Sequence, residues 1–420
     1  MSANNIRLHR GNTLFASVGD IPIWHFFGAG VLFAAACFNL VSLDSEKEEV
    51  GLDFQVYIKL AVVALCGFYG LIGFVNDIRV RTAALSFPAA WVLVVFGLYF
   101  VASLFGLDTT SGLASTVSVI CIYLMTITAA TNLGRSATLT TIYWAAGVYI
   151  VLSWVVFFLV PEFGLMEEPI LGGGFVTRMS GLSHPNTLGQ FAAITSLLGI
   201  CFYLSGKTRS WFSVALILMA LAALLGSYSR SSMMALIVAL LATYRNYFFK
   251  RENLQGWVVL IGVSIVGVMI LSTQMDIAGK LQEKSAILSK SGDSEELTTA
   301  TGRAEIWAKS IDLIASRPAI GYGPTSSKYL LDDYSYYTHN LILNVGLNCG
   351  VLGLLAAAMM CLSRLGMLFS RRSLVADGLA VFILCNGVFE NVIFSNLCGL
   401  PTICWVLALV WFKIDDGESD

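Results

Sequence analysis

Long apolar runs recur throughout this chain and constrain its fold more than any other feature of the sequence. Each run is about 17 to 23 residues long, which is the length that a helix needs to cross a lipid bilayer. Only 12% of the residues are charged, about half of what a soluble domain carries, so lipid is the solvent for most of the chain. Barrel strands would be shorter and would alternate in polarity, so these runs predict helices.

The runs predict an all-α polytopic membrane protein with about twelve transmembrane helices. The expected spans are 23–42, 55–75, 86–106, 113–131, 139–160, 186–204, 211–227, 232–249, 256–273, 340–362, 374–393 and 398–413. Three regions follow from this pattern. Residues 1–273 hold helices one to nine, residues 274–338 form one large loop subdomain, and residues 339–420 hold the last three helices and a short tail. No cleavable signal peptide is expected, because about twenty polar residues precede the first run.

Lysine and arginine are unevenly distributed between the two sets of short loops, and this predicts the orientation. One set holds about fourteen of them, Arg364 and Lys413 included, while the other holds Lys47, Arg178 and Arg230. Basic loops remain in the cytoplasm, so both termini are expected there. The large loop is then periplasmic. The cysteines lack metal-ligand spacing, and neither a metal site nor a nucleic-acid partner is expected.

Arginines and histidines gather on the predicted outer side, beside the membrane segments. Arg178, His184 and Asn186 lie in "GGGFVTRMSGLSHPN", just before the sixth span. A headgroup-level arginine and a histidine that caps the turn would explain this run equally well. Arg230 lies in "GSYSRSSM", a hairpin too short to be a solvated loop, which makes it a functional candidate unless it binds lipid headgroups.

The large loop contains an amphipathic helix in "TGRAEIWAKSIDLIASRP". Trp307, Ile311 and Ile314 are expected on its apolar face, and Glu305 is expected on the polar face. Arg303 falls in the first turn, where a cation opposes the helix dipole and does not serve helix stability. Together with the free N–H groups of that turn, its charge suits a phosphate.

His339 and Asn340 stand where the chain re-enters the bilayer, and Glu390 lies at the outer end of the eleventh span. Glu390 could orient a histidine or pair with an arginine, although it and His339 could equally be interface residues. Arginines bind phosphate oxygens through paired hydrogen bonds, and a histidine can take a proton from a hydroxyl near neutral pH. Together they predict transfer of a group away from a phosphate or pyrophosphate, without a metal ion.

Four runs in this order resemble the O-antigen ligase and Wzy-type polysaccharide polymerase superfamily: "SGLSHPNTLGQFAAI", "SYSRSSMMAL", "TGRAEIWAKSIDLIASRPAIGYGP" and "THNLILNVGLNCGVLGLL". The resemblance implies an inverting, metal-independent membrane glycosyltransferase without a cofactor, whose donor is an oligosaccharide on undecaprenyl pyrophosphate. It implies that Arg178, Arg230 and Arg303 hold the pyrophosphate, and that Arg230 and Arg303 act in catalysis. His339 would activate or position the acceptor hydroxyl, with His184, Asn186, Asn340 and Glu390 in support. No outer carboxylate pair of the glycosidase kind is expected.

Polymerases of this type carry a glycine eleven positions after an arginine in each of two outer loops. Arg178 and Gly189 have this spacing, whereas Ile314 occupies the position matching Arg303. This favours a polymerase of O-antigen or exopolysaccharide, working with a flippase and a chain-length regulator. A ligase that joins the glycan to lipid A core stays open. A polysaccharide or lipid transporter stays open too, although it would place ionisable groups near the bilayer midplane.

Overall fold

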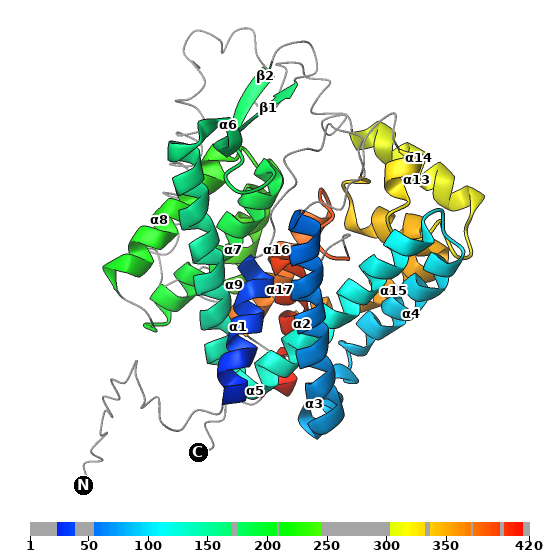
Figure 1. Ribbon diagram of the computed structural model, residues 1–420, viewed down its shortest axis with the longest axis horizontal. Coiled ribbons are helices and arrows are strands. Elements are labelled where there is room, and N and C mark those ends of the chain that lie inside the picture. Colours follow the sequence, from blue (N-terminus) through cyan, green and yellow to red (C-terminus); the bar gives the residue numbers. More distant parts are fainter. Residues whose placement is uncertain are drawn as a thin grey trace.

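The computed structural model describes residues 23–37, 54–169, 175–207, 210–244, 303–331, 337–370, 373–394 and 399–414, and these are mostly helical (Figure 1). The first helices are α1 (Ile23–Cys37), α2 (Phe54–Asn76), α3 (Ile78–Ala84), α4 (Ala90–Leu104), α5 (Thr109–Leu159) and α6 (Pro161–Gly164). An antiparallel hairpin of β1 (Leu165–Pro169) and β2 (Phe175–Met179) follows. The remaining helices are α7 (Pro185–Leu204), α8 (Trp211–Gly226), α9 (Arg230–Thr243), α13 (Arg303–Ser316), α14 (Ser327–Leu330), α15 (Leu341–Ser370), α16 (Leu374–Gly387), α17 (Leu400–Val410) and the 3₁₀ helix η2 (Trp411–Lys413).

Every predicted span that the structure describes contains a helix, although several helices end sooner than expected; the span 374–393 is helical only as far as Gly387. Four described helices are long and apolar enough to cross a membrane, namely Tyr57–Asn76, Thr109–Leu159, Pro185–Leu204 and Leu341–Leu368, and six shorter apolar helices accompany them. The described part of the chain is therefore predominantly α-helical, as expected for a polytopic membrane protein. The ninth predicted span, 256–273, lies outside the described residues, as does most of the loop 274–338. The count of twelve spans and the three-region division accordingly stay predictions.

Two of the long helices are interrupted at a glycine. α5 breaks at Gly134, where φ is 77°, so that its two halves correspond to the predicted spans 113–131 and 139–160. α15 breaks at Gly350, where φ is 67°. There the Val351 N–H donates to the Pro318 carbonyl (2.7 Å), and the Tyr322 N–H donates to the Leu347 carbonyl (2.9 Å). The segment from Pro318 to Tyr322 thus binds the backbone groups that the break exposes.

The break in α15 makes Gly350 sensitive to substitution. A Cβ at this position would stand 2.3 Å from the Pro318 carbonyl oxygen, in a left-handed conformation that costs alanine about 1–2 kcal/mol. We therefore expect Gly350→Ala to lower the thermal unfolding temperature of the purified protein. Gly366→Ala on the same helix is the matched control, because its Cβ meets nothing within 4 Å. An unchanged unfolding temperature for Gly350→Ala would contradict the observed docking of this segment.

The helix α13 is amphipathic, as predicted, but its buried face is rotated from the predicted one. Ile306, Ser310 and Ile314 are buried, whereas Ile311 is 55% exposed. α13 packs on α15 with this face. The Ser310 hydroxyl donates to the Ile306 carbonyl (2.7 Å), so a polar residue is satisfied inside the apolar stripe. The pattern of apolar residues alone does not reveal that a serine lies on the buried face of this helix.

Arg364 was counted among the basic residues of the short loops, but the structure does not place it in a loop. It lies inside α15, fully buried, and its Nη2 is 2.9 Å from Oδ1 of Asp377 in the first turn of α16. Its Nε also donates to the Ala408 carbonyl (2.9 Å). A buried arginine needs such partners to offset its desolvation. The count of basic loop residues falls by one and still favours the same side.

Candidate functional site

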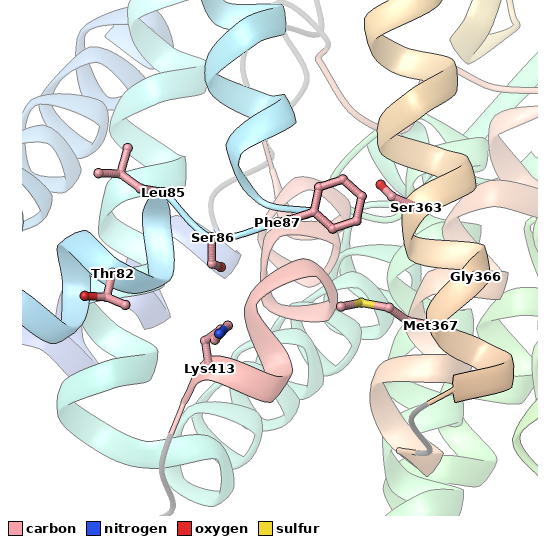
Figure 2. Close-up of a pocket in the computed structure, with 8 residues that line it drawn as sticks. All are labelled: Thr82, Leu85, Ser86, Phe87, Ser363, Gly366, Met367 and Lys413. Atoms are coloured by element: carbon pink, nitrogen blue, oxygen red, sulfur yellow. The ribbon is translucent and has the colours of Figure 1, made fainter.

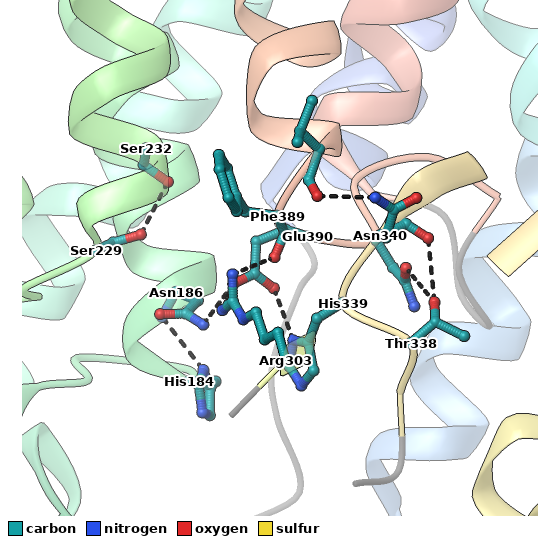
Figure 3. A network of polar contacts seen from close by, with 12 residues as sticks. His184, Asn186, Ser229, Ser232, Arg303, Thr338, His339, Asn340, Phe389 and Glu390 are labelled. Atoms are coloured by element: carbon teal, nitrogen blue, oxygen red, sulfur yellow. Dashed lines mark hydrogen bonds and ion pairs between the residues drawn. The ribbon is translucent and has the colours of Figure 1, made fainter. Parts of the chain in front are cut away.

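A network of polar side chains from distant parts of the chain gathers at one end of the helical bundle (Figure 3). Its members come from the hairpin, the start of α7, the start of α13, and the segments before α15 and after α16. Most are residues that the sequence singled out.

Glu390 is the centre of this network. Its Oε1 accepts hydrogen bonds from Arg303 Nη2 (2.9 Å) and from Asn186 Nδ2 (2.8 Å). Its Oε2 lies 3.3 Å from His339 Nδ1. Arg303 also donates from Nη1 to the Phe389 carbonyl (2.7 Å). One buried carboxylate thereby connects three segments that the sequence keeps 51 or more residues from it.

Arg178 forms a second arginine–carboxylate pair beside the first. Its Nη1 lies 2.6 Å from Glu168 Oε1, and its Nη2 donates to Asn186 Oδ1 (2.7 Å). Because Asn186 also donates to Glu390, its amide joins the two pairs into one network. His184 Nε2 lies 3.5 Å from the same Glu168 oxygen, and His184 Nδ1 accepts from the Asn186 N–H as the cap of α7.

The hairpin brings Glu168 and Arg178 together through its register. Met166 is the residue directly opposite Arg178, and Glu168 lies two positions further along β1. Side chains two positions apart point to the same face of a strand, so Glu168 is the diagonal neighbour of Arg178. The pair is therefore a product of strand pairing, which the sequence did not predict for this segment.

The spacing between Arg178 and Gly189 has a structural explanation. Arg178 Nε donates to the Ser227 carbonyl (2.8 Å) in the turn between α8 and α9. A Cβ at Gly189 would stand 2.4 Å from the Ser229 Cβ in the same turn. Both residues therefore hold this turn, and the next residue after it, Arg230, begins α9. Arg230 is half-buried at this helix start.

The backbone of His339 is held in an unusual conformation. Its φ is 48°, a left-handed value that is uncommon for residues other than glycine. The neighbouring Thr338 is fixed on both sides. Its carbonyl accepts from Trp307 Nε1 (3.1 Å), and its hydroxyl lies 3.1 Å from Asn391 Oδ1. The imidazole is thus aimed at Glu390 by a constrained backbone.

Two ionisable groups of the network have shifted pKa values. Burial alone would raise the pKa of Glu390, but the hydrogen bond with His339 and the charge of Arg303 more than offset this and lower it. Glu390 is therefore ionised at neutral pH. Burial lowers the pKa of His184, against the opposing charge of Glu168, so His184 is neutral there.

The structure places the remaining predicted residues in different roles. Asn340 is a helix cap, since its Oδ1 accepts from the Leu343 N–H (2.9 Å) and its Nδ2 donates to the Val388 carbonyl (2.9 Å). The sequence did not single out Glu168, which joins Glu390 as a second carboxylate of the network. Each carboxylate binds an arginine, so the two act as internal partners for cations.

The network presents both buried and accessible side chains. The Arg178 side chain is 3% exposed and uses all three nitrogens within the protein, whereas the side chains of Arg303 and His339 are 18% and 26% exposed. A ligand at the surface would reach Arg303 and His339 first. In the described part of the chain, no three His, Cys, Asp or Glu side chains are arranged to hold a metal ion.

Comparison with known protein families adds one finding. Residues 214–358 match the Wzy_C family model, which is described as O-Antigen ligase. The matched range includes Arg230, Arg303 and His339, while Arg178, Asn186 and Glu390 lie outside it. No curated protein matches the chain.

Proposed function

Since this chain belongs to the O-antigen ligase and Wzy family through residues 214–358, as its motifs predicted, we propose that it is a membrane glycosyltransferase of polysaccharide synthesis. Its donor is a glycan carried on undecaprenyl pyrophosphate, and its acceptor is a sugar hydroxyl at the periplasmic face of the inner membrane. The observation that carries this proposal is the contact of Arg303 and His339 with one ionised carboxylate, Glu390.

The periplasmic placement of the network is supported by the basic residues at the opposite helix ends. α7 begins beside the network at His184 and runs toward Lys207, whose Nζ donates to Ser136 near the break in α5. Lys413 likewise ends η2, far from the Glu390 side of α17. Basic residues mark the cytoplasmic end of such bundles. The network is then on the outer side, where lipid-linked glycans are joined.

The proposed reaction follows from the geometry of His339 and Arg303. The acceptor oxygen attacks the anomeric carbon of the donor, and the bond from that carbon to the pyrophosphate oxygen breaks, with inversion. His339 takes the acceptor proton on Nε2, because its Nδ1 faces Glu390, and the carboxylate stabilises the resulting imidazolium. Arg303 and the first-turn N–H groups of α13 bind the departing pyrophosphate, so no metal ion is required.

The remaining residues support this arrangement. Arg178 holds the turn that presents Arg230, and Arg230 extends the cationic surface toward the pyrophosphate. Asn186 keeps Glu390 and Arg178 at a fixed separation. The fit of Arg178 and Gly189 to the polymerase spacing leads us to propose a polymerase of O-antigen or exopolysaccharide, partnered by a flippase and a chain-length regulator.

A deletion strain whose surface glycans are resolved by length tests this function. For a polymerase we expect long chains to disappear while single-repeat caps remain. Accumulation of lipid-linked polymer that is not attached to lipid A core would instead establish the ligase, the second member of the same family. A normal glycan pattern, with every length retained, would contradict both activities.

A further inference from the structure

A groove of about 810 Å³ lies at the α3 end of the bundle (Figure 2), and none of its lining residues belongs to the Glu390 network. One wall is the connection from α3 to α4, and the opposite wall is the distal part of α15. Lys413, the last residue of η2, lines the groove between these walls. The glycosyl-transfer proposal uses none of these residues.

The walls of the groove are largely apolar. Leu85 and Phe87 on one side are each 60% exposed, and Met367 faces them from α15. Gly366 has no side chain, and a Cβ there would meet nothing within 4 Å. Leu85, Phe87 and Met367 therefore line open space beside Gly366, and these apolar surfaces suit a hydrocarbon chain.

The polar end of the groove carries a positive charge. The hydroxyls of Thr82, Ser86 and Ser363 donate to backbone carbonyls at 2.7–2.9 Å, so they do not need a further acceptor. The ammonium of Lys413 then supplies the charge, at an exposed position where the bundle ends. An exposed ammonium next to an apolar channel suits a molecule with an anionic head and a hydrocarbon tail.

We propose that this groove binds an anionic phospholipid, with an acyl chain along Leu85, Phe87 and Met367 and its phosphate beside Lys413. The lipid belongs to the leaflet at this end of the bundle. It fills the space between α4 and α15, two helices that pack against each other elsewhere, and so it stabilises the distal half of α15. This inference does not depend on the glycosyltransferase assignment.

Two variants separate the shape of the groove from its charge. Gly366→Leu fills the groove with hydrocarbon, and Lys413→Gln removes the charge from an exposed position. Gly97→Leu is the matched control, because Gly97 lies on α4 and its Cβ also meets nothing within 4 Å. The probes are phosphatidylglycerol and phosphatidylcholine, added to the full-length protein in neutral detergent and counted by native mass spectrometry.

We expect the wild-type protein and Gly97→Leu to retain phosphatidylglycerol about fivefold better than phosphatidylcholine, the preference that one cation near a headgroup supplies. Gly366→Leu should lose the bound lipid of both kinds, and Lys413→Gln should bind the two lipids equally. Undiminished phosphatidylglycerol on Gly366→Leu would overturn the proposed site. An unchanged preference in Lys413→Gln would overturn the proposed headgroup contact, whatever the effect of Gly366→Leu.

Discussion

Arg303→Ala is expected to reduce glycan transfer about 100- to 1000-fold while the protein still inserts into the membrane, since removal of one donor to a developing negative charge has effects of this size. Arg303 is partly exposed and already lies within hydrogen-bond distance of two acceptors, Glu390 and the Phe389 carbonyl. Arg303→Lys should fail as well, because an ammonium cannot replace the two-pronged contact of a guanidinium. The measurement is the length distribution of surface glycan in a complemented deletion strain, at matched protein levels.

The chain offers a matched control in the same loop region. Arg317 follows α13, donates from Nη2 to the Phe105 carbonyl (2.9 Å) and stacks on the Tyr322 ring, away from the network. Arg317→Ala should therefore leave transfer close to wild type. Normal glycan from Arg303→Ala would remove this residue from the site.

Glu390→Gln is expected to separate binding from turnover. With the carboxylate neutralised, His339 loses the group that stabilises its protonated form, so kcat should fall about 100-fold or more. Arg303 loses an internal partner that competes with the pyrophosphate, so KM for the donor should stay the same or fall. A merely structural defect would raise KM instead. A wild-type kcat for Glu390→Gln would contradict the role given to this carboxylate.

The pH dependence of the wild-type protein follows from the direction of the Glu390 pKa shift. The pKa is lowered in the folded protein, so the contribution of this carboxylate to stability is present above its ordinary value of 4.5. That contribution is lost only as the pH falls through the lowered pKa. Any loss of activity between about pH 5 and 8 is therefore not the titration of Glu390. Glu305 lies on the exposed face of α13. The variant Glu305→Gln is therefore the control that removes a nearby carboxylate without altering Glu390.

Much of the network could be predicted because its members lie in short local runs. Arg178, His184 and Asn186 stand within nine residues, and His339 directly follows the large loop. The partner of each cation could not be predicted in the same way. Glu168 reaches Arg178 through a β-hairpin register, and Glu390 reaches Arg303 across 87 residues of chain. Only the position of Glu390 at a helix end suggested that it could pair with an arginine or histidine.

The same holds for the fold: features set by neighbouring residues could be predicted, whereas contacts between residues distant in sequence could not. Apolar runs predicted the helices because hydrophobic length is a local property. The break in α15 required Pro318 to approach Gly350, and the buried place of Arg364 required Asp377. Ser310 occupied an apolar face because its hydroxyl bonds its own helix. Each of these depends on a contact that one sequence does not display.

Binding of undecaprenyl pyrophosphate to the purified protein tests the central claim most directly, because it isolates the departing group from the sugar. We predict that the wild-type protein binds undecaprenyl pyrophosphate and does not bind undecaprenol. Arg303→Ala should weaken that binding roughly 10- to 100-fold, the effect of losing hydrogen bonds to a charged group. Equal binding of both lipids, or unchanged affinity in Arg303→Ala, would contradict a pyrophosphate site built on this arginine.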